Sequence, residues 1–223
     1  MNNKDLNYLN KLIDKNKKKE KIIYQLSPNS FSNKDIIKGI KVLLSQKITM
    51  GEITKKFEKE FAKFIGSKYA LMVNSGSSAN LLAMFAMINP MKKNGLKNGD
   101  ECLIPSLCWS TSLWPILQAG LKPRFVDVDP ETLNISLKDL KKKINKKTKA
   151  IVLVHVLGNS TNMKELKKII NRYKIKLIED TCESLGSKFE KKYLGTFGEF
   201  GTYSFYYSHQ ITAGEGGMII CND

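Results

Sequence analysis

Arginine, histidine and cysteine are scarce in this sequence: its 223 residues include Arg124, Arg172, two histidines and four cysteines. The 37 basic residues are therefore almost all lysine, and they give a net charge of +16. Side chains that read base edges or clamp phosphates with two parallel hydrogen bonds are usually arginine. The lysine-dense stretch 138–149 is typical of a solvated face rather than a phosphate-binding patch. We therefore expect no nucleic-acid partner.

Long apolar runs are also lacking. No window supplies the roughly 18 consecutive apolar residues of a membrane helix, and the lysine-rich N-terminus has no apolar core of a signal peptide. The sequence thus predicts a cytoplasmic protein without membrane contact. Cys102, Cys108, Cys182 and Cys221 lack the paired short spacing of a zinc site. We expect buried free thiols and no metal.

The N-terminal part of the chain has helical patterns. Residues 1–20 are polar and predict a frayed or surface helix that leads into the domain. Two amphipathic helices follow, because apolar residues recur at helical spacing in each. Each should bury one stripe, formed in the first by Ile36, Ile40, Leu43 and Leu44 and in the second by Ile53, Phe57, Phe61, Phe64 and Ile65.

Short apolar runs then alternate with helical segments. Strands are predicted at 69–73, 101–105, 124–128, 150–158 and 175–180, with helices at 81–88, 110–118, from Ser136 onward and 163–173. This alternation predicts an α/β fold with a mostly parallel central sheet and helices on both faces. A turn and a strand end the chain, so we expect a truncation before a C-terminal domain. The predicted organisation is an N-terminal helical lead-in, 1–30, and an incomplete large domain, 31–223.

Ligands of a parallel sheet bind at the carboxyl ends of its strands, where several motifs fall. In NSGSSAN, 74–80, backbone N–H groups at a helix start and the hydroxyls of Ser77 and Ser78 are suited to an anion. Alone, this motif is more typical of a tight turn with a helix cap. In IEDTCES, 178–184, Glu179 and Asp180 end a strand, where an acid is often just a cap.

Two further motifs follow strands in the same way. Trp109 lies in PSLCWSTS at a strand-to-helix turn, where a large aromatic side chain could equally belong to the core. The segment 204–218, SFYYSHQITAGEGGM, ends a strand with Ser204 and has His209 five residues later, before a glycine-rich loop. These features are much more specific together than apart.

Together, these motifs resemble in order and spacing the DegT/StrS family of pyridoxal-phosphate enzymes, which act on nucleotide-linked keto-sugars and have the fold-type I aminotransferase architecture. The resemblance runs from about Ile48 to the last residue and includes FVDVDPETLNI, VHVLGN, LIEDTCESLGS and ITAGEGG. It implies the large domain of that fold. It also implies a homodimer whose sites borrow residues from the partner.

The resemblance assigns cofactor-binding roles residue by residue. Ser77, Ser78 and Ser204 would hold the cofactor phosphate. Asp180 would pair with the protonated pyridine nitrogen. Glu183 stands near the ring hydroxyl, where many aminotransferase members have glutamine, and Trp109 would stack on the ring face. The implied cofactors are pyridoxal 5'-phosphate and pyridoxamine 5'-phosphate.

His209 is the decisive position. Aminotransferases of this family have lysine here, which forms a Schiff base with the cofactor, whereas this chain has no lysine after Lys192. An imidazole cannot form that bond but can move a proton. The substitution resembles a branch of 3-dehydrases that make 3,6-dideoxyhexoses, in which the histidine removes a proton from the cofactor methylene and the C3 hydroxyl of the sugar leaves. Members of that branch commonly have a second histidine where this chain has Gln210.

The sequence therefore predicts a 3-dehydrase, with His209 as base, acting on a CDP- or GDP-linked 4-keto-6-deoxyhexose in surface-polysaccharide synthesis. The alternatives are a sugar aminotransferase and a non-catalytic homologue that binds the cofactor or a sugar nucleotide. Retention of Asp180 and Trp109 together favours an active site. One subgroup of such dehydrases carries an iron–sulfur cluster on cysteines beyond the histidine segment, with a reductase partner, and the other regenerates the amine cofactor with glutamate. The sequence leaves this choice open.

Overall fold

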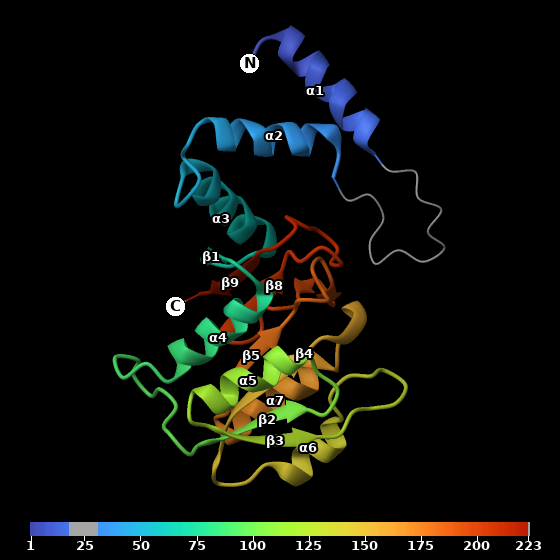
Figure 1. The fold of residues 1–223 in the computed structure, drawn as a ribbon. Helices are drawn as coiled ribbons and strands as arrows, with labels where there is room; N and C mark the ends of the chain where they lie inside the picture. The colour runs from blue at the N-terminus through green and yellow to red at the C-terminus, as the bar shows by residue number, and fades with distance from the viewer. Residues whose placement is uncertain (18–30, 223) are drawn as a thin grey trace. The chain divides into compact units, whose positions relative to one another are not determined.

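The computed structural model describes residues 1–17 and 31–222, and the chain divides into two compact units, Met1–Lys56 and Phe57–Asp223 (Figure 1). The first unit holds α1 (Asn3–Asn16), α2 (Asn33–Leu44) and the beginning of α3 (Glu52–Ile65). Capping boxes begin α1 and α2, since Asn2 and Ser32 each exchange hydrogen bonds with an aspartate three residues later. The N-terminal helix is thus confirmed over 3–16. Residues 18–30 of the predicted lead-in lie outside the described residues, and the boundary at residue 30 stays a prediction.

The buried stripe predicted for the first amphipathic helix is wrong at Leu43 and Leu44, and Ile36 and Ile40 are half-buried. In α2 the buried side chain is Ile37, whereas Leu43 and Leu44 are exposed. Periodicity identifies an apolar face but not what covers it, and within this unit α1 is the helix that contacts α2. The stripe of α3 is confirmed only in part, because Phe61 and Ile65 are buried and Ile53 and Phe64 are exposed.

The second unit is built on one seven-stranded sheet of order β1-β9-β8-β5-β4-β2-β3. All neighbours pair in parallel except β9, which is antiparallel to β1 and β8. The mostly parallel sheet is therefore confirmed. Its strands are β1 (Tyr69–Val73), β2 (Glu101–Pro105), β3 (Lys122–Val126), β4 (Thr148–Val154), β5 (Lys176–Asp180), β8 (Phe200–Ser204) and β9 (Gly217–Cys221). A separate hairpin is formed by β6 (Lys188–Phe189) and β7 (Lys192–Tyr193).

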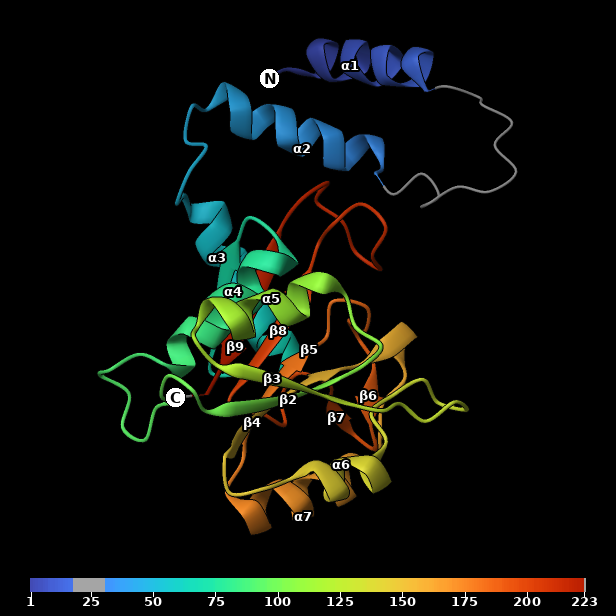
Figure 2. The same cartoon turned by 60° about the horizontal axis from the view of Figure 1, so that its bottom comes forward.

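Helices cover both faces of the sheet, as predicted. Figure 2 shows α4 (Gly76–Met87) and α5 (Ser110–Gln118) on one face, and α6 (Leu137–Lys143) and α7 (Met163–Tyr173) on the other. Ala83 and Ile116 pack against the first face in one buried cluster, and Leu140 and Leu166 pack against the second face in another. The end of α3 adds a third cluster, in which Phe61 makes an edge contact with the ring of Tyr203. The core thus fixes the sheet whose strand ends carry the predicted motifs.

Two predicted strands end earlier than expected. The strand predicted at 124–128 is β3, which ends at Val126 because the N–H of Asp127 donates to the Asp139 carboxylate, 2.8 Å away, instead of to a strand. The strand predicted at 150–158 ends at Val154, and a 3₁₀ turn, η1 (Val156–Gly158), follows. Within this turn Leu157 has a φ of 53°, a left-handed conformation that no strand contains.

All four cysteines are free, but the expectation of four buried thiols is wrong for three of them. Cys102 is buried in the middle of β2, which raises the pKa of its thiol to about 12. Cys108, Cys182 and Cys221 are half-buried, because they lie at or beyond strand ends. Across residues 1–17 and 31–222, no group of three His, Cys, Asp or Glu side chains could hold a metal ion. Among the helices of the described part, none has the length and apolarity needed to cross a membrane.

Candidate active site

The strand ends of β1, β8 and β9 lie in register. Val73, the last residue of β1, and Ser204, the last residue of β8, both pair with Gly217 at the start of β9. The turn from β1 into α4 is therefore placed beside Ser204. Gly76 allows the approach, because a Cβ atom built on it would lie 2.6 Å from the Cβ of Ser204 and 2.8 Å from the Cys182 sulfur.

The three serines predicted to bind phosphate lie in this turn and at the end of β8. Ser77 is exposed and Ser78 is half-buried in the first turn of α4, directly after Gly76, which lies beside Ser204. The N-cap is Ser75, whose Oγ accepts the Ser78 N–H at 3.0 Å and donates to Ser78 Oγ at 3.1 Å. Ser75 was missed by the sequence analysis, although serine directly before a helical pattern is a standard cap signal. The free end of α4 with its hydroxyls is suited to an anion.

Asp180 ends β5 with its carboxylate almost fully buried, at 5% exposure. Its Oδ2 accepts hydrogen bonds from Asn80 Nδ2 and Ser112 Oγ, both at 2.7 Å, and its Oδ1 accepts the Cys182 N–H at 3.1 Å. Asn80 and Ser112 were missed by the sequence analysis. They are 100 and 68 residues away along the chain, so no local pattern signals the contact.

Glu179, beside Asp180, has a different role on the opposite face of the sheet. Its carboxylate accepts the backbone N–H groups of Gly195, Phe197 and Gly198 at 2.6–2.9 Å and lies 3.0 Å from His155 Nε2. Glu179 and His155 are fully buried. Turns rather than a helix follow β5, so the helix-cap interpretation of these acids is wrong.

Glu183 and His209 come from two loops that meet near Asp180. The Glu183 carboxylate accepts the Leu157 N–H at 2.9 Å, and its carbonyl accepts Gln210 Nε2 at 2.6 Å. The half-buried His209 donates its backbone N–H to the Tyr206 carbonyl. Burial lowers the pKa of His209 below its ordinary value, and the nearby charges of Glu183 and Asp180 oppose that change. The lowered pKa favours the neutral form of the imidazole.

Trp109 occupies the N-cap position of α5, with 73% of the residue exposed. Its carbonyl accepts the N–H of Ser112 at 2.9 Å, so the first turn of α5 carries both the indole and the hydroxyl that binds Asp180. The indole face is open to a ligand. The core interpretation of Trp109 is therefore wrong.

These groups fit a flat, phosphorylated, nitrogen-containing ring. The serines at the start of α4 and the end of β8 offer hydroxyls to a phosphate, and the tight approach at Gly76 shapes a backbone cradle there. Asp180 has acceptor capacity left on Oδ1 for a protonated ring nitrogen, because a carboxylate oxygen has two lone pairs and Oδ1 accepts the backbone N–H of Cys182. Residues that could hold such a cofactor are Ser77, Ser78, Trp109, Asp180, Glu183 and Ser204.

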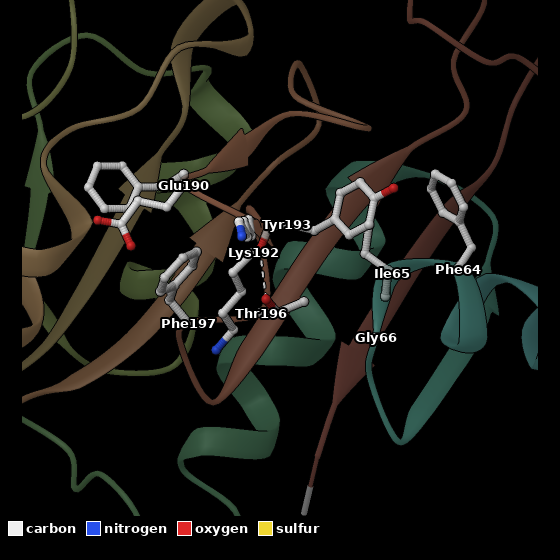
Figure 3. A pocket seen from close by; sticks show the side chains of 10 residues that line it. Phe64, Ile65, Gly66, Glu190, Lys192, Tyr193, Thr196 and Phe197 are labelled. Atoms are coloured by element: carbon white, nitrogen blue, oxygen red, sulfur yellow. Dashed lines mark hydrogen bonds between the residues drawn. The ribbon is translucent and has the colours of Figure 1, made fainter.

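A separate pocket of about 480 Å³ lies between the end of α3 and the β6–β7 hairpin (Figure 3). Phe64 and Tyr193 face each other with ring centroids 5.1 Å apart, and Thr196 Oγ1 donates to the Tyr193 carbonyl at 2.6 Å. None of the predicted site residues lines it. We assign it no ligand.

Known proteins are similar to this chain in sequence and fold. The sequence pattern of the DegT/DnrJ/EryC1/StrS aminotransferase family matches residues 31–223. GDP-4-keto-6-deoxy-D-mannose 3-dehydratase from Escherichia coli O55:H7 is 47% identical over 202 residues, which are 91% of this chain and 52% of the relative. The chain thus spans about half the length of the curated relative it matches.

Two solved structures of GDP-4-keto-6-deoxymannose-3-dehydratase are similar to the chain, each with a TM-score of 0.84 and 46% identity over 90% of this chain and 52% of the other. One is a His-to-Asn variant with bound GDP-perosamine, and the other holds a trapped PLP-glutamate geminal diamine. The fold-type I architecture is therefore confirmed. On the match over residues 31–223, the chain belongs to the DegT/DnrJ/EryC1/StrS aminotransferase family.

Proposed function

We propose that the protein is an enzyme dependent on pyridoxal or pyridoxamine phosphate that removes the C3 hydroxyl of a nucleotide-linked 4-keto-6-deoxyhexose. The observation that carries the proposal is His209, a half-buried histidine near Asp180 and Glu183, in a chain with no lysine after Lys192. A GDP-linked substrate is supported by the name of the 47% identical relative and by the GDP-perosamine bound in a similar structure. The product would serve 3,6-dideoxysugar and surface-polysaccharide synthesis.

The proposal gives the site residues separate binding roles. Ser77, Ser78 and Ser204 hold the cofactor phosphate at the start of α4. Trp109 covers one face of the ring with its exposed indole. Glu183, which is fixed by the Leu157 N–H, lies near the ring hydroxyl.

The chemistry then depends on two residues. Bound pyridoxamine phosphate supplies the amine that condenses with the C4 ketone and an electron sink conjugated to it. Asp180 accepts a hydrogen bond from the pyridine nitrogen and stabilises positive charge there, which favours electron withdrawal. His209 takes a proton from the carbon that bears the amine. Burial lowers the pKa of His209, which favours the neutral imidazole that a base requires.

The amine form of the cofactor must be restored after each turnover. The structure of a relative with glutamate trapped on PLP supports glutamate as the amine donor here. We therefore favour the glutamate-regenerated subgroup over the one with an iron–sulfur cluster and a reductase partner.

The proposal also includes a homodimer. Leu43 and Leu44 at the end of α2 are exposed apolar side chains that a partner subunit could cover, which supports it. The cytoplasmic location inferred from the sequence stays a prediction.

A single-turnover experiment tests the proposed function. The full-length protein is mixed with pyridoxamine phosphate and GDP-4-keto-6-deoxymannose without glutamate, and the sugar is analysed by mass spectrometry. We expect a product lighter by one oxygen atom, with conversion of pyridoxamine phosphate to pyridoxal phosphate and release of ammonia. An amino sugar as product would establish the aminotransferase alternative, and an unchanged sugar would support the non-catalytic one.

A further inference from the structure

Asp180 is connected to a buried chain of side chains that reaches β8. Thr202 Oγ1 donates to Asn80 Oδ1 at 2.6 Å, and Asn80 Nδ2 donates to Asp180 Oδ2 at 2.7 Å. The exposures are 0% for Thr202 and 6% for Asn80. We propose that Asn80, oriented by Thr202, is a positioning residue that holds Asp180 as the acceptor for the pyridine nitrogen of the cofactor. This inference rests on the proposed function.

The direction of these hydrogen bonds carries the argument. A carboxylate is only an acceptor, so the end of the Asn80 amide that faces Asp180 must be the NH₂ group. The Asn80 oxygen then needs a donor on its other side, and the hydroxyl of Thr202 provides it. In the reversed amide, an oxygen would face the Asp180 carboxylate, and that pair repels. Thr202 thus selects the amide orientation that supports a charged Asp180.

The Glu179 carbonyl is a weaker acceptor for the Thr202 hydroxyl than Asn80 is. Its hydroxyl also lies 3.3 Å from the Glu179 carbonyl, against 2.6 Å from Asn80. A hydrogen bond of 2.6 Å between oxygens is at the short end of the usual range, and one of 3.3 Å is beyond it. Between these two oxygens, the hydroxyl proton therefore points to Asn80.

The network also distinguishes the two oxygens of Asp180. Oδ2 accepts from both Asn80 and Ser112, which uses its two lone-pair directions. Oδ1 accepts the Cys182 N–H at 3.1 Å and has a second lone-pair direction. Asn80 and Ser112 thus fix the carboxylate plane and leave Oδ1 for the ring nitrogen. No local sequence motif indicates this role of Asn80, because Asn80 and Asp180 are 100 residues apart along the chain.

The test measures protonation of the ring nitrogen directly. Full-length protein variants are loaded with pyridoxamine phosphate labelled with ¹⁵N in the ring, and the ¹⁵N chemical shift is followed against pH. In Asn80→Leu and Thr202→Val, we expect the titration midpoint of the ring nitrogen to fall by about one pH unit or more, a tenfold change in the protonation ratio. Thr202→Val keeps the shape of the side chain and removes only the hydroxyl.

Two matched variants should leave the midpoint unchanged. Thr202→Ser restores the hydroxyl. Thr148→Val removes another buried hydroxyl, which donates to the Glu101 carboxylate at 2.8 Å. Thr148 begins β4, at the end of the strand opposite to the one that pairs with Asp180. A midpoint that falls in Asp180→Asn but stays at the wild-type value in Asn80→Leu and Thr202→Val would overturn the inference and leave the proposed function standing. A midpoint that does not change in Asp180→Asn would overturn both.

Discussion

Gly76 at the start of α4 and Ser204 at the end of β8 leave no space between them for a side chain. A Cβ atom on Gly76 would lie 2.6 Å from Ser204 Cβ, closer than non-bonded carbon atoms pack. The obstructing atoms sit next to the backbone, so they cannot rotate away. This close approach places the first turn of α4 against Ser204 and assembles the proposed phosphate site.

We therefore predict that Gly76→Ala weakens cofactor binding and destabilises the fold. The added methyl group must displace α4 or β8, at a cost of about 1–3 kcal/mol in the free energy of unfolding. Chemical denaturation measures the loss of stability, and fluorescence titration with pyridoxal phosphate measures affinity.

The matched control is Gly39→Ala, another helical glycine, which has no atom within 4 Å of the added Cβ. It should leave cofactor affinity unchanged and should not destabilise the protein, because alanine favours helix by about 0.5–1 kcal/mol over glycine. Equal cofactor affinity in Gly76→Ala and the wild type would contradict the proposed phosphate site.

A second prediction concerns the buried carboxylate of Glu179. Three backbone N–H groups and His155 surround it, so Glu179→Gln would turn an NH₂ group toward a donor and leave buried groups unpaired. We expect a loss of about 3 kcal/mol or more in the free energy of unfolding. Hydrogen exchange should increase first at residues 195–198, the loop held by the carboxylate.

Glu165→Gln is the control for this substitution. Glu165 forms an exposed ion pair with Lys141, and exposed pairs contribute about 0–1 kcal/mol. Its stability should stay close to that of the wild type. If Glu179→Gln is as stable as Glu165→Gln, the loop is held by something other than this carboxylate.

Much of the fold follows from local patterns. The strands predicted at 69–73 and 101–105 and the helices at 110–118 and 163–173 coincide with β1, β2, α5 and α7, because each is a contiguous apolar or periodic segment with clear flanks. Ser136 caps α6 as expected. The β6–β7 hairpin, by contrast, is only two residues per strand and has no periodic pattern to detect.

The residues of the candidate site also divide into those that a local motif indicates and those that only the fold brings together. Ser77, Trp109, Asp180 and His209 lie in motifs that are continuous in the sequence. Asn80, Ser112 and Thr202 contribute through contacts across the sheet, which depend on strand order. Strand order places β9 between β1 and β8, a relationship that no local pattern of residues 69–73 predicts.

The lowered pKa of His209 predicts the position of the acidic limb in the pH–rate profile. The proposed base must be neutral, so kcat/KM should rise with pH through the pKa of His209, and the midpoint of this rise should lie below pH ~6.5, the ordinary histidine value. The negative charge of Glu183 opposes this lowering of the His209 pKa. Glu183→Gln should therefore shift the limb to lower pH, whatever its effect on the maximal rate. A shift to higher pH would show that another group controls the limb.

The final prediction concerns His209 itself. Because imidazole cannot form an imine, borohydride treatment of the pyridoxal form should leave no cofactor attached at residue 209, and dialysis should remove the cofactor. His209→Lys should gain a borohydride-stable attachment there, detectable by peptide mass spectrometry, and should lose dehydration. The lysine variant is thus a positive control for the labelling reaction.

His209→Asn separates proton transfer from binding. An asparagine amide can hydrogen-bond but cannot accept the proton, so the variant should bind pyridoxamine phosphate with near wild-type affinity. Loss of the C3 hydroxyl should slow by about 10²–10⁴-fold, the usual contribution of a general base. The single-turnover product assay measures that rate, and circular dichroism checks the fold. Dehydration by His209→Asn at close to the wild-type rate would mean that another group moves the proton. The role of His209 would then be limited to packing beside the ring, and the function of the protein would have to be assigned again within its family.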